Sequence, residues 1–413
     1  MTQIALPLDI ASLEIIAQSS DNKGNIILEV RSKKAYSTCH KCGKHATKRY
    51  GVAPSLTIRH LPILDTPVYL VIHPIRYQCE HCDDHPTTTE QYDWCDRRST
   101  TTKGLDAYIA RSLIHSTIQD VSRKEGLGYD SVVSAVDRQI KQQVDWSQYD
   151  DLDTLGIDEI ALKKGHGEYV VIVSARTKAG ALSVIGVLPN RLKETVWGFL
   201  KTIPEPLRLT VKAVCTDLYD GFVQAATEVF GSGAVVVDRF HVAKLYREPL
   251  DALRIKELAR LKTELPDEEY AELAGIMWSM RKKHECLTQT DKAALAALYR
   301  HSPKLKQALS LAIKLTHIFN AQSSRRAALA KFDRWVTKVA KSSCNCFNKF
   351  TRTLQKYKSS IANYFKDRKN SGFVEGLNNK IKVAKRRCYG LCKTESLFQR
   401  LYLDLQGYTK FAR

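Results

Sequence analysis

The stretches T-L-G-I-D-E-I-A-L at 154–162 and V-K-A-V-C-T-D-L-Y-D-G-F at 211–222 each place an acidic residue after a short β-branched, apolar run. Such runs are typical of buried strands. Alternation along the first strand puts Ile157 on one face and Asp158 on the other, while Glu159 returns to the face of Ile157. We therefore favour Asp158 over Glu159 as a candidate ligand, together with Asp217 from the second strand.

A third acid, Glu375, lies in S-G-F-V-E-G-L-N-N-K-I-K at 371–382, which reads as a helix. Carboxylates from two strands and a helix are suited to two Mg²⁺ or Mn²⁺ ions that drive in-line attack on a phosphodiester. The alternative for any one acid is a helix cap or a solvated turn residue, which is how we interpret Asp220 and Glu228. The order of the three acids along the chain favours a catalytic site.

The elements around the acids predict a multidomain α/β protein with an RNase H-like core over 150–244 and 370–413. Three strands form a meander, and a helix, strand, helix and strand follow. Residues 245–369 contain one glycine and read as an all-α insertion. We expect Trp278 and Trp335 of this insertion to pack between helices; stacking on an unpaired base is the alternative. The second and third strands of the meander are predicted at Tyr169–Ala175 and Ala181–Leu188. The elements that follow are a helix at Leu192–Ile203, a strand at Val211–Thr216, a helix at Gly221–Phe230 and a strand at Ala234–Asp238.

The last predicted core strand ends in D-x-x-H, formed by Asp238 and His241. One interpretation places both near the metals, where they contact DNA or orient a ligand. The other is a helix N-cap aspartate with a histidine that faces the core.

The first 98 residues predict a small β-rich zinc-binding domain. It begins with a hairpin over 11–35 and contains two C-x-x-C pairs, Cys39 with Cys42 and Cys79 with Cys82. Four thiolates suit one structural Zn²⁺, with His40, His45, His81 and His85 as possible substitute ligands. Unrelated buried or redox-active cysteines are the alternative. The polar, Thr-rich residues 84–103 read as a linker.

Residues 99–146 show helical periodicity interrupted by Gly126 and Gly128, which predicts a helix-turn-helix domain. The helix from Tyr129 to about Gln142 is the candidate reader of the major groove, and a plain helical connector is the alternative. A basic run after Glu375 would hold the phosphates of the scissile strand, unless it is only a solvated helix face. The DNA-contacting candidates are Arg123, Lys124, Ser131, Ser134, Arg138, Gln139, Lys141, Lys380, Lys382, Lys385, Arg386 and Arg387.

The whole chain of 413 residues carries a net charge of +20 and has a pI near 9.4, which favours a polyanionic partner. No apolar run is long enough to span a bilayer, and the start lacks the pattern of a signal peptide. Eleven cysteines, an odd number, fit a reduced compartment better than a disulfide framework. We therefore expect a cytoplasmic protein that binds DNA and no membrane.

The segments G-I-D-E-I-A at 156–161, T-D-L-Y-D-G-F at 216–222, V-V-D-R-F-H-V at 236–242 and F-V-E-G-L-N-N-K-I-K at 373–382 resemble insertion-sequence transposases of the bacterial ISL3 family. The resemblance covers nearly the whole chain and implies an Asp-Asp-Glu transposase with Asp158, Asp217 and Glu375 as metal ligands. It implies binding to terminal inverted repeats, strand cleavage, strand transfer and a dimer or larger assembly. The alternatives are a catalytically silent, domesticated DNA-binding regulator and a nuclease that does not transfer strands.

Overall fold

The computed structural model describes residues 8–161, 169–370, 372–388 and 393–411. The predicted turn at 163–168 lies outside these residues. The chain forms two compact units: the first contains Met1–Gln142, Ala384–Tyr389 and Phe398–Arg413, and the second contains Gln143–Val383 and Gly390–Leu397. Among the described residues, no helix has both the length and the apolar character that crossing a membrane requires.

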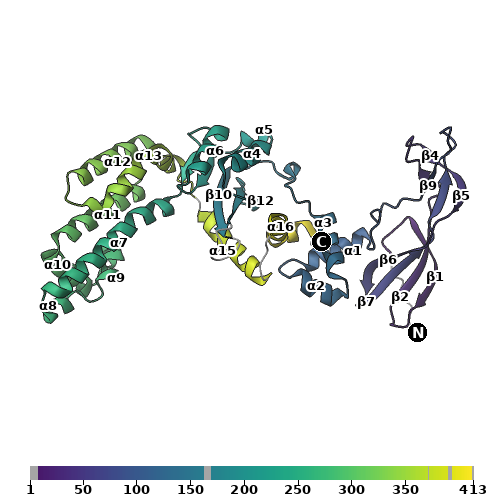
Figure 1. Cartoon of the computed structure of the whole chain (residues 1–413), viewed down its shortest axis with the longest axis horizontal. Helices are drawn as coiled ribbons and strands as arrows, with labels where there is room; N and C mark the ends of the chain where they lie inside the picture. Colours follow the sequence, from purple (N-terminus) through teal and green to yellow (C-terminus); the bar gives the residue numbers. More distant parts are fainter. Residues whose placement is uncertain (1–7, 162–168, 371, 389–392, 412–413) are drawn as a thin grey trace. The chain divides into compact units, whose positions relative to one another are not determined.

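The first unit begins with a β-rich region (Figure 1). A four-stranded sheet has the order β1-β2-β7-β6, and β1 and β2 form the antiparallel hairpin that the sequence predicts. Leu28, Val30, Leu70 and Ile72 supply much of its buried face. A three-stranded sheet has the order β5-β8-β9, and β3 pairs with β4. The strands are β1 (Leu13–Ser20), β2 (Ile26–Ser32), β3 (Ser37–Thr38), β4 (His45–Ala46), β5 (Lys48–Val52), β6 (Leu56–Ile63), β7 (Thr66–Ile72), β8 (Ile75–Gln78) and β9 (Thr87–Thr89).

Residues 84–103 are not a linker, contrary to the prediction. β9 pairs with β8, and the segment after it bonds to β6, where the Arg59 N–H donates to the Thr100 carbonyl at 2.8 Å. Trp94 and Cys95 are buried in the core of the first sheet. The polar composition of the segment concealed this role, because two apolar side chains and β-branched threonines suffice to hold it in place.

The first unit continues with three helices, α1 (Lys103–Ser112), α2 (Ile118–Glu125) and α3 (Tyr129–Gln139). The hydroxyls of Thr102 and Thr117 cap the first two helices, and Gly126 ends α2 with a left-handed φ of 61°. The final helix, α16 (Thr394–Phe411), adds Leu403 to the core of these three helices. The predicted core segment 370–413 is therefore divided, because α16 from Phe398 onward packs with the helix-turn-helix.

The second unit contains a five-stranded sheet of order β12-β11-β10-β13-β14 (Figure 1). β10, β11 and β12 are antiparallel, whereas β10, β13 and β14 are mutually parallel. Leu155 and Ile157 of β10 pack in one core with α4 and α6 residues such as Leu200 and Phe222. The elements are β10 (Thr154–Ala161), β11 (Tyr169–Arg176), β12 (Leu182–Leu188), α4 (Lys193–Thr202), α5 (Glu205–Arg208), β13 (Ala213–Thr216), α6 (Asp220–Phe230) and β14 (Val235–Val237).

The predicted insertion is helical, but its first helix already begins at Arg239, directly after β14. Phe319, Phe332 and Trp335 pack together in its core, so Trp335 occupies the predicted interhelical position. Trp278 does not, because 61% of its surface is exposed. The helices are α7 (Arg239–Glu264), α8 (Asp267–Ala271), α9 (Ile276–Arg281), α10 (Gln289–His301), α11 (Pro303–Asn320), α12 (Arg325–Ala340), α13 (Asn348–Ala362) and α14 (Tyr364–Asp367), followed by α15 (Gly372–Arg387).

Candidate active site

Three aspartates follow one another across the parallel part of the sheet. Ile157 of β10 pairs with Thr216 of β13, and Thr216 pairs with Val237 of β14. The residues that come next in each strand or directly after it are Asp158, Asp217 and Asp238. Because the three strands run in the same direction, these carboxylates gather at one edge of the sheet. This edge is where open α/β sheets generally bind ligands.

Helix α15 brings Glu375 to the same region. Its first turn lies so close to β10 that a Cβ added to Gly156 would be 2.3 Å from Cγ2 of Val374. One turn after Glu375, the Asn378 amide donates a hydrogen bond to Oδ2 of Asp158. Glycine at position 156 therefore permits the close approach that joins a helix carboxylate to the strand carboxylates.

The face of Glu159 agrees with the alternation argument. Its carboxylate accepts a hydrogen bond from Nη1 of Arg191 at 3.0 Å, away from the Asn378 side of the strand. Asp220 and Glu228, interpreted above as surface acids, pair with Lys356 and Lys193 respectively. Each of these three acids is paired with a basic side chain.

The environment of Asp217 fits a divalent cation. Burial raises the pKa of Asp217. The Tyr219 backbone N–H, which donates to this carboxylate at 3.1 Å, and the charge of His241 oppose the rise, whereas the smaller effects of the Asp158 and Glu159 charges add to it. Crowded carboxylates of this kind repel one another unless a cation lies between them. Within the described residues, the buried Asn378 Oδ1 also lacks a hydrogen-bond partner. Hard oxygen atoms are the ligands that Mg²⁺ prefers.

Asp238 and His241 combine features of both sequence interpretations. Asp238 is the N-cap of α7 and accepts a hydrogen bond from the Phe240 N–H at 3.1 Å. Its other oxygen lies 3.1 Å from Nδ1 of the half-buried His241. This hydrogen bond raises the pKa of His241, and the charges of Asp217 and Asp158 act in the same direction. The imidazole therefore lies within electrostatic reach of the carboxylates and is not a core-facing residue.

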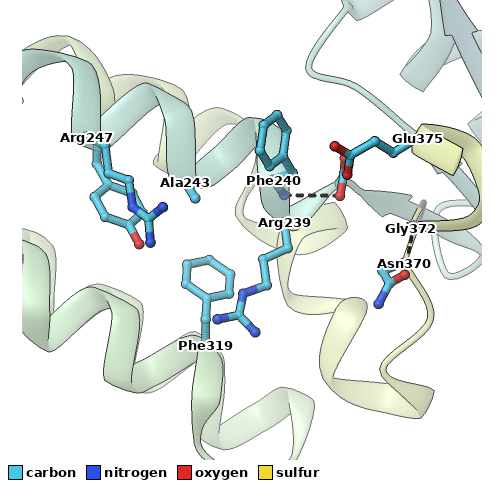
Figure 2. A pocket seen from close by; sticks show the side chains of 10 residues that line it. Arg239, Phe240, Ala243, Arg247, Phe319, Asn370, Gly372 and Glu375 are labelled. Atoms are coloured by element: carbon cyan, nitrogen blue, oxygen red, sulfur yellow. Dashed lines mark hydrogen bonds between the residues drawn. The ribbon is translucent and has the colours of Figure 1, made fainter. Parts of the chain in front are cut away.

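A cavity of about 320 Å³ adjoins the site (Figure 2). Glu375 lines one side of it, and Phe240 and Arg247 of α7 line another. The remaining lining residues are Asp238, Arg239, Ala243, Tyr246, Phe319, Asn370 and Gly372.

The cysteine pairs form a second site, in the first unit. The four sulfur atoms of Cys39, Cys42, Cys79 and Cys82 lie within 4.8 Å of one another, and the Cys79–Cys82 separation is 3.8 Å. A tetrahedral zinc ion about 2.3 Å from each sulfur requires neighbouring sulfurs roughly 3.8 Å apart.

Hydrogen bonds support a thiolate site at these cysteines. Backbone N–H groups of Cys42 and Lys41 lower the pKa of Cys39 to about 7, whereas the neighbouring sulfur of Cys42 raises the pKa of Cys82. Four thiols in so small a space do not all ionise without a cation. His40 and His85 bond instead to Thr88 and to the Cys79 carbonyl, which leaves the four cysteines as the ligand set.

The helix-turn-helix exposes some of the predicted DNA contacts and holds another, Arg138, in an ion pair within the domain. Arg138 does not face outward: its guanidinium makes a two-pronged ion pair with Asp106, at 2.6 and 2.9 Å, and also bonds to Thr101. Arg138 is therefore removed from the set of base-reading candidates. Ser131 and Gln139 are partly exposed, and the exposed members are Arg123, Lys124, Ser134 and Lys141.

The basic residues of α15 likewise differ in their exposure and in their ion pairs. Arg387 pairs with the buried Asp404 of α16, so it is not available to a phosphate. Lys385 is half-buried, and Lys380, Lys382 and Arg386 are exposed.

The sequence analysis did not identify Asn378 as a residue of the site, nor Arg191 as the partner that holds Glu159 away from it. A signal existed for Asn378, because a residue three positions after Glu375 lies on the same face of a helix. No local pattern indicates the pairing of Arg191 with Glu159. It depends on how the fold brings the segment between β12 and α4 next to β10.

Comparison with known proteins identifies the family. Residues 155–401 match the family model of the DDE transposases of family ISL3, which is described as a transposase. Residues 90–140 match the model of the helix-turn-helix domain of transposase family ISL3. The transposase for insertion sequence element IS1001 of Bordetella parapertussis is 26% identical over 373 residues, which span 89% of each chain. The transposase for insertion sequence element IS1557 of Mycobacterium tuberculosis is 23% identical over 423 aligned positions, spanning 97% of this chain and 93% of the relative. The chain therefore belongs to the transposase family ISL3.

Proposed function

We propose that this chain is a DNA transposase that binds terminal inverted repeats, cleaves there with divalent metal ions and transfers the resulting 3′-ends to target DNA. The observation that carries the proposal is the gathering of Asp158 and Asp217 at one sheet edge beneath a helix that bears Glu375. The names of the relatives, both transposases for insertion sequence elements, support it.

We assign the core of the second unit to the RNase H-like class. Its sheet order, three antiparallel strands followed by two strands parallel to the first, supports this assignment. The proposed domains are a zinc-binding region over 1–98, a helix-turn-helix over 99–146, a core over 150–244 and 370–397, and the helical insertion between the two core segments. The helix-turn-helix also takes the last turns of α16, on the basis of its contacts.

In the proposed reaction Asp158, Asp217 and Glu375 hold the metal ions. Magnesium bound there would activate a water molecule or a 3′-hydroxyl and stabilise the leaving oxygen. Asn378 holds the Asp158 carboxylate in place, and Asp238 orients His241 toward the same charges. The protein positions the phosphodiester and compensates its charge, which is most of what phosphoryl transfer requires.

The exposed cations and polar groups of α2 and α3 would contact the inverted repeat, and Lys380 and Lys382 of α15 would hold the strand near the site. Lys385 and Arg386, which belong to the first unit, remain predicted DNA contacts. The zinc is structural, because four cysteines leave no open coordination position. Two ends must be cut together, so we propose a homodimer or a larger synaptic assembly.

The test is cleavage of a duplex that carries the end of the element in magnesium. Asp158→Asn, Asp217→Asn and Glu375→Gln should each lower cleavage roughly 100-fold or more, since a lost ligand removes several kcal/mol of charge stabilisation. Glu159→Gln is the matched control: it neutralises the next residue of the same strand, which pairs with Arg191, and should leave most of the activity.

Two outcomes would replace the proposal. If the wild type binds the duplex but does not cut it under any metal condition, the chain acts as a DNA-binding regulator. If the wild type cuts but yields no joined product with target DNA, the chain is a nuclease without strand transfer.

A further inference from the structure

The cavity beside Glu375 has the composition of a nucleotide site. The first two turns of α7 supply one wall, where Phe240, Ala243 and Arg247 recur at helical spacing on the same face. Glu375 and Gly372 supply the facing wall (Figure 2). The volume of about 320 Å³ falls at the lower end of the range for sites of small ligands.

Phe240 is the first notable residue of this wall. It is 59% exposed and lies two residues after Asp238, the N-cap of α7. Its ring meets the His241 ring edge to face at 5.9 Å. The exposed Phe240 side chain is also one of those that line the cavity (Figure 2). An exposed aromatic face beside carboxylates is suited to a flat, uncharged group such as a nucleobase.

Two arginines give the cavity a cationic end, and they differ in their partners. Arg239 bonds to Asn320 and to the Tyr364 hydroxyl and lies 5.7 Å from the centre of the Phe319 ring, so its role is internal. Arg247 is exposed, and within the described residues its guanidinium has no hydrogen-bond or ion-pair partner. A guanidinium without an acid is suited to a phosphate.

We propose that this cavity holds one unpaired nucleotide next to the scissile phosphate, with its base on Phe240 and its flanking phosphate at Arg247. The inference rests on the proposed function, because Glu375 belongs both to the cavity wall and to the proposed metal ligands. Glu375 and Phe240 line the same cavity, so a phosphodiester held at Glu375 would have its neighbouring nucleotide in that cavity. The free energy needed to extrude a base from the duplex is smallest where its pair is already mismatched. A protein that extrudes this base should therefore bind a mismatched duplex more tightly than a paired one.

The test compares two duplexes that carry the terminal inverted repeat of the element, measured with the full chain in calcium. One is fully paired, and the other has a mismatch at the pair that flanks the cleavage site. The wild type should bind the mismatched duplex roughly 10-fold more tightly, because less free energy is needed to extrude a base that is not paired. Phe240→Leu should abolish this preference and Phe240→Tyr should retain it. Since Phe240 is exposed, neither change should affect folding.

Arg247→Ala should weaken binding of both duplexes and reduce the dependence of affinity on salt. Lys244→Ala is the matched control, because Lys244 lies on the same helix outside the cavity and already pairs with Glu248. A 5-iodouracil placed at the flanking position should photocross-link to the peptide that contains Phe240. A cross-link to Trp278 of α9, or equal affinity of wild type and Phe240→Leu for the two duplexes, would overturn the proposal.

The two proposals fail separately. A wild type that prefers the mismatched duplex but never cleaves in magnesium would reject the chemistry and retain the nucleotide site. A wild type that cleaves without any preference between the duplexes would retain the chemistry and reject the nucleotide site.

Discussion

Arg138 on the third helix of the helix-turn-helix forms a two-pronged ion pair with Asp106 on the first helix. The Asp106 side chain is only 1% exposed and that of Arg138 is 24% exposed. The pair fixes the angle between the helix proposed to read DNA and the helix that supports it. A residue that resembles a DNA contact in sequence is therefore part of the frame of the domain.

Replacement of Arg138 should consequently affect stability before it affects recognition. Arg138→Met leaves the Asp106 carboxylate buried with only the Thr101 hydroxyl, a change that costs about 3 kcal/mol for buried pairs. Urea unfolding followed by far-UV circular dichroism measures this loss, and the double variant Arg138→Met with Asp106→Leu should recover much of it. Unchanged stability with weaker DNA binding would instead return Arg138 to the DNA contacts.

Asn378 should act on the reaction through Asp158. Asn378→Ala removes the amide that holds this carboxylate, and losses of about 10- to 100-fold are typical when a group that orients a metal ligand is removed. The magnesium concentration at half-maximal cleavage should rise, whereas DNA affinity should not change. The matched control is Asn379→Ala, an exposed neighbour on the same helix. A defect of equal size in both variants would argue against a specific role of Asn378.

Removal of zinc should unfold the small sheet that carries the cysteines and leave the second unit folded. We expect about one zinc per chain by elemental mass spectrometry, lost in Cys79→Ser and retained in Cys286→Ser, whose exposed cysteine lies in the helical insertion. Structural zinc contributes directly to folding free energy, so chelation should lower the first thermal transition. Full zinc content in Cys79→Ser would refute the four-cysteine site.

The stability of the first unit should fall in mild acid because of His60. Its Nε2–H donates to the Leu8 carbonyl at 3.2 Å, and its Nδ1 accepts from the Thr102 hydroxyl that caps α1. Burial lowers the pKa of His60, so the folded state binds its proton less readily than the unfolded chain does. Stability is thus complete above a pH of about 6.5, the ordinary pKa of histidine, and declines below it by at most roughly 1.4 kcal/mol per pH unit.

Thermal unfolding of the first unit between pH 7.5 and 5.5 tests this expectation. His60→Asn should be less stable at neutral pH and should flatten the dependence on pH. His73→Asn is the control, since His73 is more than half exposed. An unaltered slope in His60→Asn would assign the acid sensitivity to other groups.

The sequence predicted those features that depend on local periodicity. Alternation along β10 separated Asp158 from Glu159 correctly, because a strand places neighbouring residues on opposite faces whatever the rest of the fold. The hairpin, the three helices and the order of strands and helices in the second unit also follow local patterns. The catalytic and DNA-contact assignments remain predictions.

Features that depend on distant partners could not be predicted in this way. Arg138 and Arg387 look like solvated cations, and only the fold reveals Asp106 and Asp404 as buried acids that neutralise them. The same limitation concealed the role of Trp94 within a polar segment. The packing partner of α16 was not predictable either, because its apolar face could pack against the core of either unit.

The position of α16 has a consequence for the order in which the protein is made. Leu403 enters the core of the helix-turn-helix, Gln399 donates to Asp137 and to the Ile140 carbonyl, and Arg400 donates to the Leu113 carbonyl. The DNA-binding module is thus completed by residues that the ribosome adds after Glu375. A nascent or prematurely terminated chain would have an unfinished DNA-binding module. Under the proposed function, such a chain would not occupy the ends of the element ahead of the full-length protein.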